Sequence, residues 1–250
     1  KQRLGFYTSE SFLRSINLAF DIDVPERIAH FQPTSKSAIL FSSILGLRKS
    51  RAFLVIAPYG SGKSITSTAA IHLLENRADS QTTLKEISQR RRGVDSNLYS
   101  FSKERLELKG SSRGLALTIS GYAPNLSSAL ITSLRASLAR GGFRQSERFL
   151  KKLNNLTVTE VLRAIADFLP KLIQQGVDRI AIVWDEFGRH LEGIVESGET
   201  ASLDDVQVLA EFASRYFTVP LTFTVLMHQS LLNYAINLPQ SSKREWKKIE

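Results

Sequence analysis

The chain has 250 residues, of which 42% are hydrophobic and 23% charged, as is usual for a globular protein that can bury one sizeable α/β domain. It has no cysteine, which excludes disulfides, thiolate chemistry and cysteine zinc sites and fits a cytoplasmic location. No apolar run approaches the roughly 18 residues that span a bilayer, and charges at Lys1, Arg3 and Glu10 argue against a signal peptide, so we expect no membrane contact.

The net charge of +9 is concentrated in one part of the chain. Residues 77–152 carry 15 Lys and Arg against 6 Asp and Glu, whereas the rest carries 18 of each kind. A basic surface is typical of proteins that bind a polyanion, so this segment indicates DNA or RNA as a partner. The alternative is a solvated helical face without a ligand.

The first part of the chain predicts a helix, a strand and a second helix in that order. Residues 1–50 form an N-terminal helical segment, in which Thr34 or Ser35 can cap a helix. Residues 51–56 are a short apolar run before a turn with glycines, which is typical of a buried parallel strand. A helix is expected over residues 63–76, where apolar residues recur.

The middle of the chain predicts a helical, basic insertion over residues 77–113. Residues 114–121 then read as a second strand. Asn125 can cap the helix that follows, because leucines recur at four-residue spacing, and Gly141 with Gly142 can end it.

The last part continues the alternation. We expect helices over 157–175 and 204–217, strands over 179–184 and 221–227, and a helical turn from Ser230 onward. Alternating strands and helices favour an α/β fold with a parallel sheet, whose core spans residues 51–250. Since the chain does not begin with Met and ends in a helix-like stretch over 243–250, we expect a fragment of a longer protein.

The segment Ala57-Pro-Tyr-Gly-Ser-Gly-Lys-Ser64 matches the phosphate-binding loop G-x-x-x-x-G-K-[ST], except that Ala57 replaces the first glycine. Such a loop turns its backbone N–H groups toward an anion, and the next helix points its positive end at the phosphates. Lys63 would supply charge to the β- and γ-phosphates and Ser64 a hydroxyl to Mg²⁺. We expect ATP and Mg²⁺ here, bound through Ala57, Pro58, Tyr59, Gly60, Ser61, Gly62, Lys63, Ser64 and Ile65.

A second motif is the apolar run 180–184, which leads directly into Asp185 and Glu186. In open α/β sheets, ligands bind at the carboxyl ends of the strands. We predict that Asp185 holds Mg²⁺, directly or through a water, together with Ser64, and that Glu186 is the general base that activates the attacking water. The guanine-reading motif Asn-Lys-x-Asp is absent from the sequence, which favours ATP over GTP.

The phosphate loop after one strand, an intervening strand, and a third strand ending in Asp185-Glu186 resemble the P-loop ATPases with a catalytic glutamate, notably the AAA+ and STAND branches. The resemblance implies a three-layer α/β/α sandwich within a larger, bacterial ATPase. In these families the second strand is inserted between the first and the third, so the resemblance places residues 114–120 there. The segment Phe187-Gly-Arg-His-Leu-Glu192 also resembles large bacterial ATP-binding proteins, including components of phage-defence systems.

The same families carry a polar sensor residue after the next strand, and here either His228 or Gln229 would contact the γ-phosphate or position the water. Arg189 and His190 follow the acidic pair and either contact phosphate or are simply exposed. An arginine finger and a helical lid, which AAA+ proteins usually carry, cannot be assigned.

The leading hypothesis is an ATPase module that powers a larger, nucleic-acid-associated or phage-defence machine, with a homo-oligomer left open. The first alternative is a nucleotide switch that binds ATP and acts by assembly with little turnover. The second is a small-molecule kinase, in which Arg90-Arg-Arg92 would imitate an arginine-rich lid.

Overall fold

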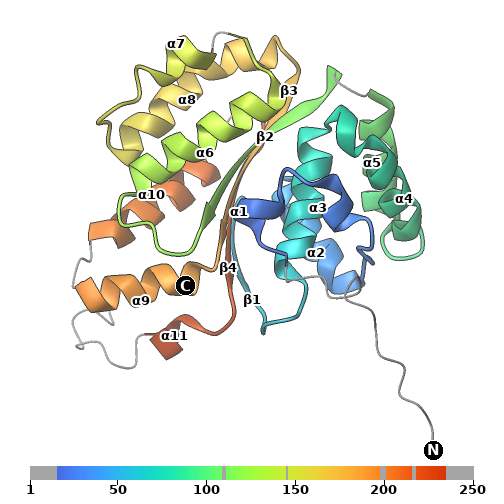
Figure 1. Ribbon diagram of the computed structural model, residues 1–250, viewed down its shortest axis with the longest axis horizontal. Coiled ribbons are helices and arrows are strands. Elements are labelled where there is room, and N and C mark those ends of the chain that lie inside the picture. Colours follow the sequence, from blue (N-terminus) through green and yellow to red (C-terminus); the bar gives the residue numbers. More distant parts are fainter. Residues whose placement is uncertain (1–15, 109–110, 145, 198–200, 216–217, 235–250) are drawn as a thin grey trace, which may run out of the picture.

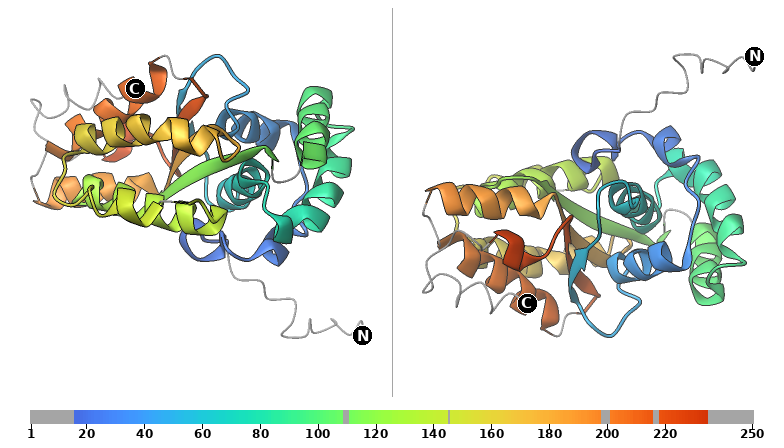
Figure 2. Two further views of the ribbon diagram at one scale, coloured as in Figure 1. Left: turned by 90° about the horizontal axis from the view of Figure 1, so that it is seen from above. Right: turned by 90° about the horizontal axis from the view of Figure 1, so that it is seen from below.

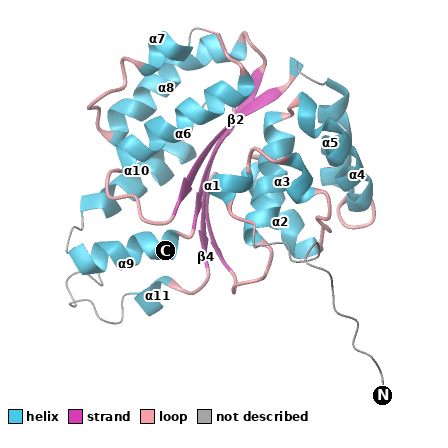
Figure 3. Ribbon diagram, viewed as in Figure 1, coloured by secondary structure: helices cyan, strands magenta, loops and turns pink. Residues whose placement is uncertain are grey.

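The computed structural model describes residues 16–108, 111–144, 146–197, 201–215 and 218–234. Within these residues four parallel strands form one sheet in the order β1-β4-β3-β2, and helices cover both of its faces (Figures 1 and 3). The strands are β1 (Ala52–Ile56), β2 (Arg113–Ser120), β3 (Val177–Asp185) and β4 (Leu221–Met227). The chain is therefore a three-layer α/β/α sandwich, which confirms the predicted fold class.

One face of the sheet is covered by the N-terminal half of the chain. Its elements are α1 (Leu18–Asp21), η2 (Pro25–Ile28), α2 (Ser35–Ile44), α3 (Lys63–Glu75), η3 (Ala78–Ser80), α4 (Gln81–Arg91) and α5 (Ser96–Leu108). Helix α3 packs on the sheet, and α4 and α5 lie beyond it (Figure 2). Leu18 and Phe41 are buried in one cluster with Ile71 of α3 and Ala181 of β3, so residues 16–50 share the core of this layer.

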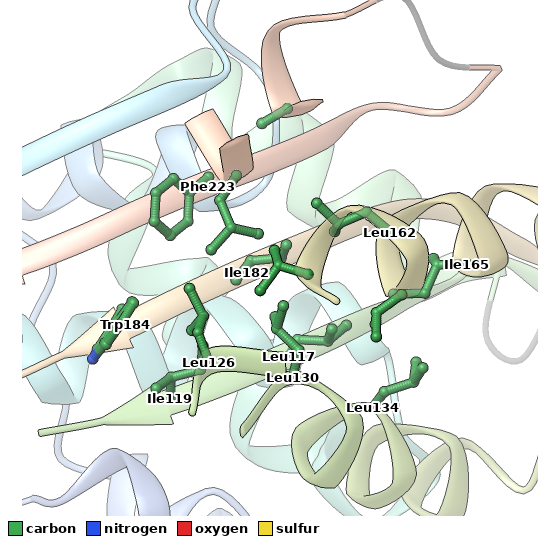
Figure 4. Close-up of a cluster of buried hydrophobic side chains, with 14 of the residues drawn as sticks. Leu117, Ile119, Leu126, Leu130, Leu134, Leu162, Ile165, Ile182, Trp184 and Phe223 are labelled. Atoms are coloured by element: carbon green, nitrogen blue, oxygen red, sulfur yellow. The ribbon is translucent and has the colours of Figure 1, made fainter. Parts of the chain in front are cut away.

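The other face is covered by α6 (Leu126–Gly141), α7 (Ser146–Leu150), α8 (Val158–Ile173), α9 (Phe187–Ser197), α10 (Ala201–Ser214) and α11 (Leu231–Tyr234). Figure 4 shows how the leucines at four-residue spacing in α6 pack against the strands, with Leu126 beside Ile119 and Leu130 beside Leu117 of β2. The same cluster includes Ile182 of β3 and Leu162 of α8. Removing this apolar surface from water is what holds the layer on the sheet.

Side-chain caps begin three of the predicted helices. Thr34, not Ser35, caps α2 and forms a reciprocal capping box with Ser37. Asn125 accepts a hydrogen bond from the Ser128 N–H at 2.8 Å at the start of α6. Thr157 caps α8 in the same way as Thr34 caps α2. These caps satisfy N–H groups that have no partner within the helix, which is why the predicted starts agree with the observed ones.

One prediction about the sheet was wrong. Residues 114–120 do not lie between the first and third strands: β2 forms an edge of the sheet, and β4 lies between β1 and β3. All four strands are short apolar runs, so their sequences do not reveal their order in the sheet. Every residue of β4 is buried, as expected for a central strand, whereas most of β1 is only half-buried.

The short helices α1 and η2 lie within the expected N-terminal helical segment, whereas α7 and α9 occur where no helix was predicted. The expected helix over 243–250 lies outside the described residues, as does the end of the helix expected over 204–217. Among the described residues, no helix combines the length and the apolar character needed to cross a bilayer.

Candidate nucleotide-binding site

The predicted phosphate-binding loop, residues 57–64, connects β1 to α3, so it leaves the sheet at the carboxyl end of a strand. Gly60 and Gly62 have φ values of +74° and +83°, a region that residues with a Cβ rarely adopt. A Cβ on Gly60 would meet no atom within 4 Å, so the glycine is required by the backbone conformation and not by crowding. The loop therefore has the curvature of an anion-binding nest with open space above it.

Helix α3 begins directly at Lys63, and among the described residues no side chain caps its N-terminus. Its first N–H groups and its positive dipole end thus face the space above the loop. The Lys63 ammonium donates hydrogen bonds to the carbonyls of Ala57 and Pro58, the latter at 3.0 Å. Burial lowers the pKa of Lys63, and the nearby charge of Asp185 opposes that effect. The loop therefore holds its lysine in place at the site expected for the phosphates.

Asp185 is the last residue of β3, and its carboxylate faces the start of α3. The Ser64 hydroxyl donates a hydrogen bond of 2.7 Å to Asp185 Oδ2, which joins residues 121 positions apart. The other carboxylate oxygen, Oδ1, accepts the backbone N–H of Glu186 at 2.8 Å. Both predicted Mg²⁺ ligands are thus in direct contact. A hydroxyl and a carboxylate fit Mg²⁺, which takes one or two protein oxygens and completes its shell with phosphates and water.

Glu186 has a backbone φ of +52°. The other non-glycine residues with positive φ in the described parts of the chain are two asparagines, Asn76 and Asn155, a residue type that tolerates this region. A glutamate there costs about 1–2 kcal/mol, and such strain is often found at functional sites. The Glu186 carboxylate lies 3.4 Å from the Arg189 guanidinium, one turn into α9.

A cavity of about 520 Å³ brings these groups together, a size within the usual range of small-molecule pockets. It is lined by residues 59–65 of the loop, Asp185 and Glu186 after β3, residues 226–228 at the end of β4, and Ile16, Arg27 and His30. Ala57 and Pro58 are not among the described lining residues; they contribute the carbonyls that hold Lys63.

The N-terminal wall of the cavity was missed by sequence reasoning. Ile16 precedes α1, Arg27 lies in η2, and His30 follows it. Arg27 is oriented by an ion pair of 3.5 Å with Asp21, whose side chain is buried. No local motif marks these residues, because they reach the cavity only through the packing of α1 and η2 against α3.

The two sensor candidates differ in position. His228 lines the cavity, as expected for a residue that follows a strand between the P-loop strand and the acidic strand. Gln229 is not among the described lining residues, and its side chain is hydrogen-bonded to Tyr234. The geometry therefore favours His228 over Gln229.

The prediction that His190 contacts phosphate or is exposed was wrong. His190 is fully buried on α9, packs against Trp184 and Phe187, and burial lowers its pKa to about 4. Phe187, His190, Leu191 and Ile194 are all buried and follow helical spacing, so this periodicity was the signal that could have placed His190 in the core. Arg189, one residue earlier, is exposed and pairs with Glu186.

The basic segment 77–152 is not one uniform cationic surface. Arg91 is buried, with its guanidinium 3.8 Å from the ring centroid of Phe41 and a hydrogen bond to Ser102. Arg105 and Arg140 are buried or nearly so in ion pairs. Arg90 donates to backbone carbonyls of the segment between η2 and α2. The arginines at 90–92 therefore do not form one exposed cationic surface, because Arg90 and Arg91 hold parts of the fold together.

No established family model matches the chain, and no curated protein matches it. Among solved structures, a similar one is the ORC2 protein of Aeropyrum pernix, described as ADPNP–ADP complexes. The two chains share 15% sequence identity with a TM-score of 0.45, and the similarity covers 90% of this chain and 49% of that one. This chain thus spans about half the length of the ORC2 chain. The assignment of the fold rests on the strands and the loop of this chain itself.

Proposed function

We propose that this chain is an ATPase module that binds ATP with Mg²⁺ at the P-loop and hydrolyses it. The observation that carries the proposal is the 2.7 Å hydrogen bond from Ser64 to Asp185. It joins the phosphate-binding loop to the acidic strand, although the two motifs are far apart in the sequence. Neither motif alone specifies a reaction, whereas both at one cavity support phosphoryl transfer from a nucleotide.

The phosphates would replace the contacts that the P-loop now makes with itself. Lys63 would exchange its bonds to the loop carbonyls for bonds to phosphate oxygens, which are stronger because both partners are charged. The first N–H groups of α3 would complete the anion site. The nucleoside has room beside the loop, where Arg27 and His30 line the cavity.

Ser64 and Asp185 would hold Mg²⁺, which neutralises charge on the phosphates when bound. For this the Ser64 hydroxyl must release Asp185 and turn its oxygen lone pair toward the ion. Glu186 follows Asp185 at the same cavity, where its carboxylate can take a proton from the attacking water. Its present partner Arg189 must release it first.

The Glu186–Arg189 ion pair also favours the second candidate, a nucleotide switch with little turnover. With its carboxylate held by Arg189, Glu186 does not act on water, so ATP would bind and remain intact. The kinase hypothesis gains no such support, because Arg90 and Arg91 form hydrogen bonds within the fold and are not among the residues that line the cavity.

A turnover assay separates these functions. The chain is incubated with ATP and Mg²⁺, with and without candidate phosphate acceptors, and free phosphate and acceptor products are quantified. An ATPase releases phosphate without an acceptor, a switch binds ATP in calorimetry and releases none, and a kinase requires the acceptor. Absence of ATP binding at millimolar ATP and Mg²⁺ would contradict the proposal as a whole.

We also propose a nucleic-acid backbone as a partner, bound at a narrower surface than the segment 77–152. Four cations around α7 are exposed, with one acid between them: Arg144, Arg148, Lys151 and Lys152. The Arg144 N–H donates to Gln175, which precedes β3, so this surface lies at the amino ends of the strands, away from the P-loop. ATP and a polyanion would therefore not compete for one site.

The salt dependence of binding tests this partner. Binding of a labelled DNA duplex should weaken steeply with salt. Replacing the four cations by Gln should reduce the steepness of the plot of the logarithm of the binding constant against the logarithm of the salt concentration by about one for each lost phosphate contact. The exposed pair Arg48 and Lys49, changed to Gln, is the matched control. No binding at low salt, or the same slope in the parent and in the variant with the four changes, would contradict nucleic acid as a partner.

A further inference from the structure

His228 lies between two tyrosine rings that come from different elements. Tyr59, in the P-loop, stacks on it with ring centroids 4.3 Å apart and planes inclined by 24°. Tyr234, in α11, approaches its edge at nearly a right angle, with centroids 5.8 Å apart. The Tyr234 hydroxyl is 3.2 Å from the ring nitrogens of His228. One imidazole is thus contacted on its face and at its edge.

His228 lies where it can take part in the proposed reaction. His228 follows β4, which lies between the P-loop strand β1 and the acidic strand β3. It lines the same cavity as Lys63 and Glu186. An imidazole at this position can donate a hydrogen bond to a phosphate oxygen or to the attacking water only while its ring keeps one orientation.

Tyr234 is itself held firmly. A Cβ on Gly188 would lie only 1.9 Å from the Tyr234 hydroxyl oxygen, so this glycine allows the tyrosine to rest on the first turn of α9. Gln229 adds a side-chain hydrogen bond to Tyr234, and burial raises the pKa of its hydroxyl. Tyr234 is 7% exposed, whereas Tyr59 is 72% exposed. The edge contact therefore comes from a packed side chain, whereas the face contact comes from an exposed ring carried by the P-loop.

We propose that Tyr59 and Tyr234 are positioning residues for His228. The Tyr234 hydroxyl sets the orientation of the imidazole, and the Tyr59 ring couples that orientation to the conformation of the P-loop. This inference rests on the proposed ATPase function, since it assigns a role to His228 in that reaction. It adds two side chains that contact His228 and are not required to contact the reacting atoms.

Kinetics of matched variants test the proposal. Tyr234→Phe keeps the ring and removes the hydroxyl, so kcat for ATP should fall about 5- to 10-fold, the usual effect of one lost hydrogen bond, while KM changes less than about twofold. Tyr59→Leu should lower kcat more than Tyr59→Phe, which retains the stacked ring. In a His228→Ala background both effects should disappear, because the residue that they position is gone. Tyr99→Phe, on α5 and away from the cavity, is the control that removes a hydroxyl without effect.

A spectroscopic readout keeps this inference separate from the ATPase proposal. The NMR signals of the His228 ring are identified by their loss in His228→Ala, and stacking on Tyr59 shifts them upfield. Tyr59→Leu should move them downfield even if the chain never hydrolyses ATP. If the parent hydrolyses ATP and the tyrosine variants lower kcat equally with and without His228, the positioning role is refuted. If the His228 ring signals do not change in Tyr59→Leu, the stacking on which the positioning role depends is refuted. If the signals change in that variant but the parent does not hydrolyse ATP, only the ATPase proposal is refuted.

Discussion

Replacing Lys63 by Ala gives the most quantitative prediction about the phosphate site. The ammonium is held at the centre of the loop by two backbone carbonyls, so it needs little reorganisation to face a phosphate. A unit charge about 4 Å from another at an effective dielectric constant near 20 contributes about 4 kcal/mol. Exchanging the present hydrogen bonds reduces the net gain by about 1 kcal/mol. The remaining 3 kcal/mol or so corresponds to a loss of roughly 100-fold in affinity for ATP.

Titration calorimetry with ATP and Mg²⁺ measures this loss directly. Lys49→Ala, an exposed lysine outside the cavity, is the matched control and should bind ATP as the parent does. Thermal unfolding of Lys63→Ala shows whether the variant is folded. A folded Lys63→Ala chain with the affinity of the parent would refute the assignment of the loop.

Three further predictions follow from particular side chains. In Asp185→Asn the side chain should still accept the hydrogen bond from the Ser64 hydroxyl. Because the carboxylate charge facing Mg²⁺ is lost, the Mg²⁺ concentration needed for half-maximal ATP binding should rise about tenfold. An unchanged magnesium titration would count against Asp185 as a ligand. In urea unfolding, Arg91→Ala should have a free energy of unfolding about 2–3 kcal/mol lower than Arg91→Met, because Met fills the same buried space. Arg92 is exposed, so Arg92→Ala should stay within about 0.5 kcal/mol of the parent. Equal stability of the two Arg91 variants would show that packing at this position is unimportant. Burial lowers the pKa of His190 to about 4, so as the pH falls the unfolded chain takes up a proton on this ring before the folded chain does. The free energy of unfolding should therefore fall as the pH drops from about 6.5 toward 4, and His190→Phe should reduce that fall. An identical pH profile in the variant would contradict the burial of a neutral His190.

That the loop 57–64 and the acidic pair 185–186 meet could be predicted because each segment is contiguous and follows an apolar strand. In a parallel sheet both strands end at the same edge, so the sequence already implies that Ser64 and Asp185 meet, and the structure places them in contact. Helix starts at Thr34, Asn125 and Thr157 were equally predictable, because a cap is a local hydrogen bond between neighbours in sequence.

Other features depend on tertiary packing, which the sequence shows only indirectly. The order of four apolar strands has no local signature, and Arg27 and His30 reach the cavity through the placement of η2. The arginines at 90–92 look equivalent in sequence, yet successive helical residues are turned by about 100°, so only Arg91 joins the buried face with Leu84, Ile87 and Ser88. Helical spacing, applied to these charged residues, was the available signal.

The central claim is that Glu186 activates water for hydrolysis of ATP held at the P-loop. Its most direct test is phosphate release by Glu186→Gln, measured beside the parent together with ATP affinity. The amide keeps the shape of the side chain and removes the base, so ATP affinity should stay within about twofold while kcat falls by 10²-fold or more. A Glu186→Gln chain that releases phosphate at the parental rate would contradict the account.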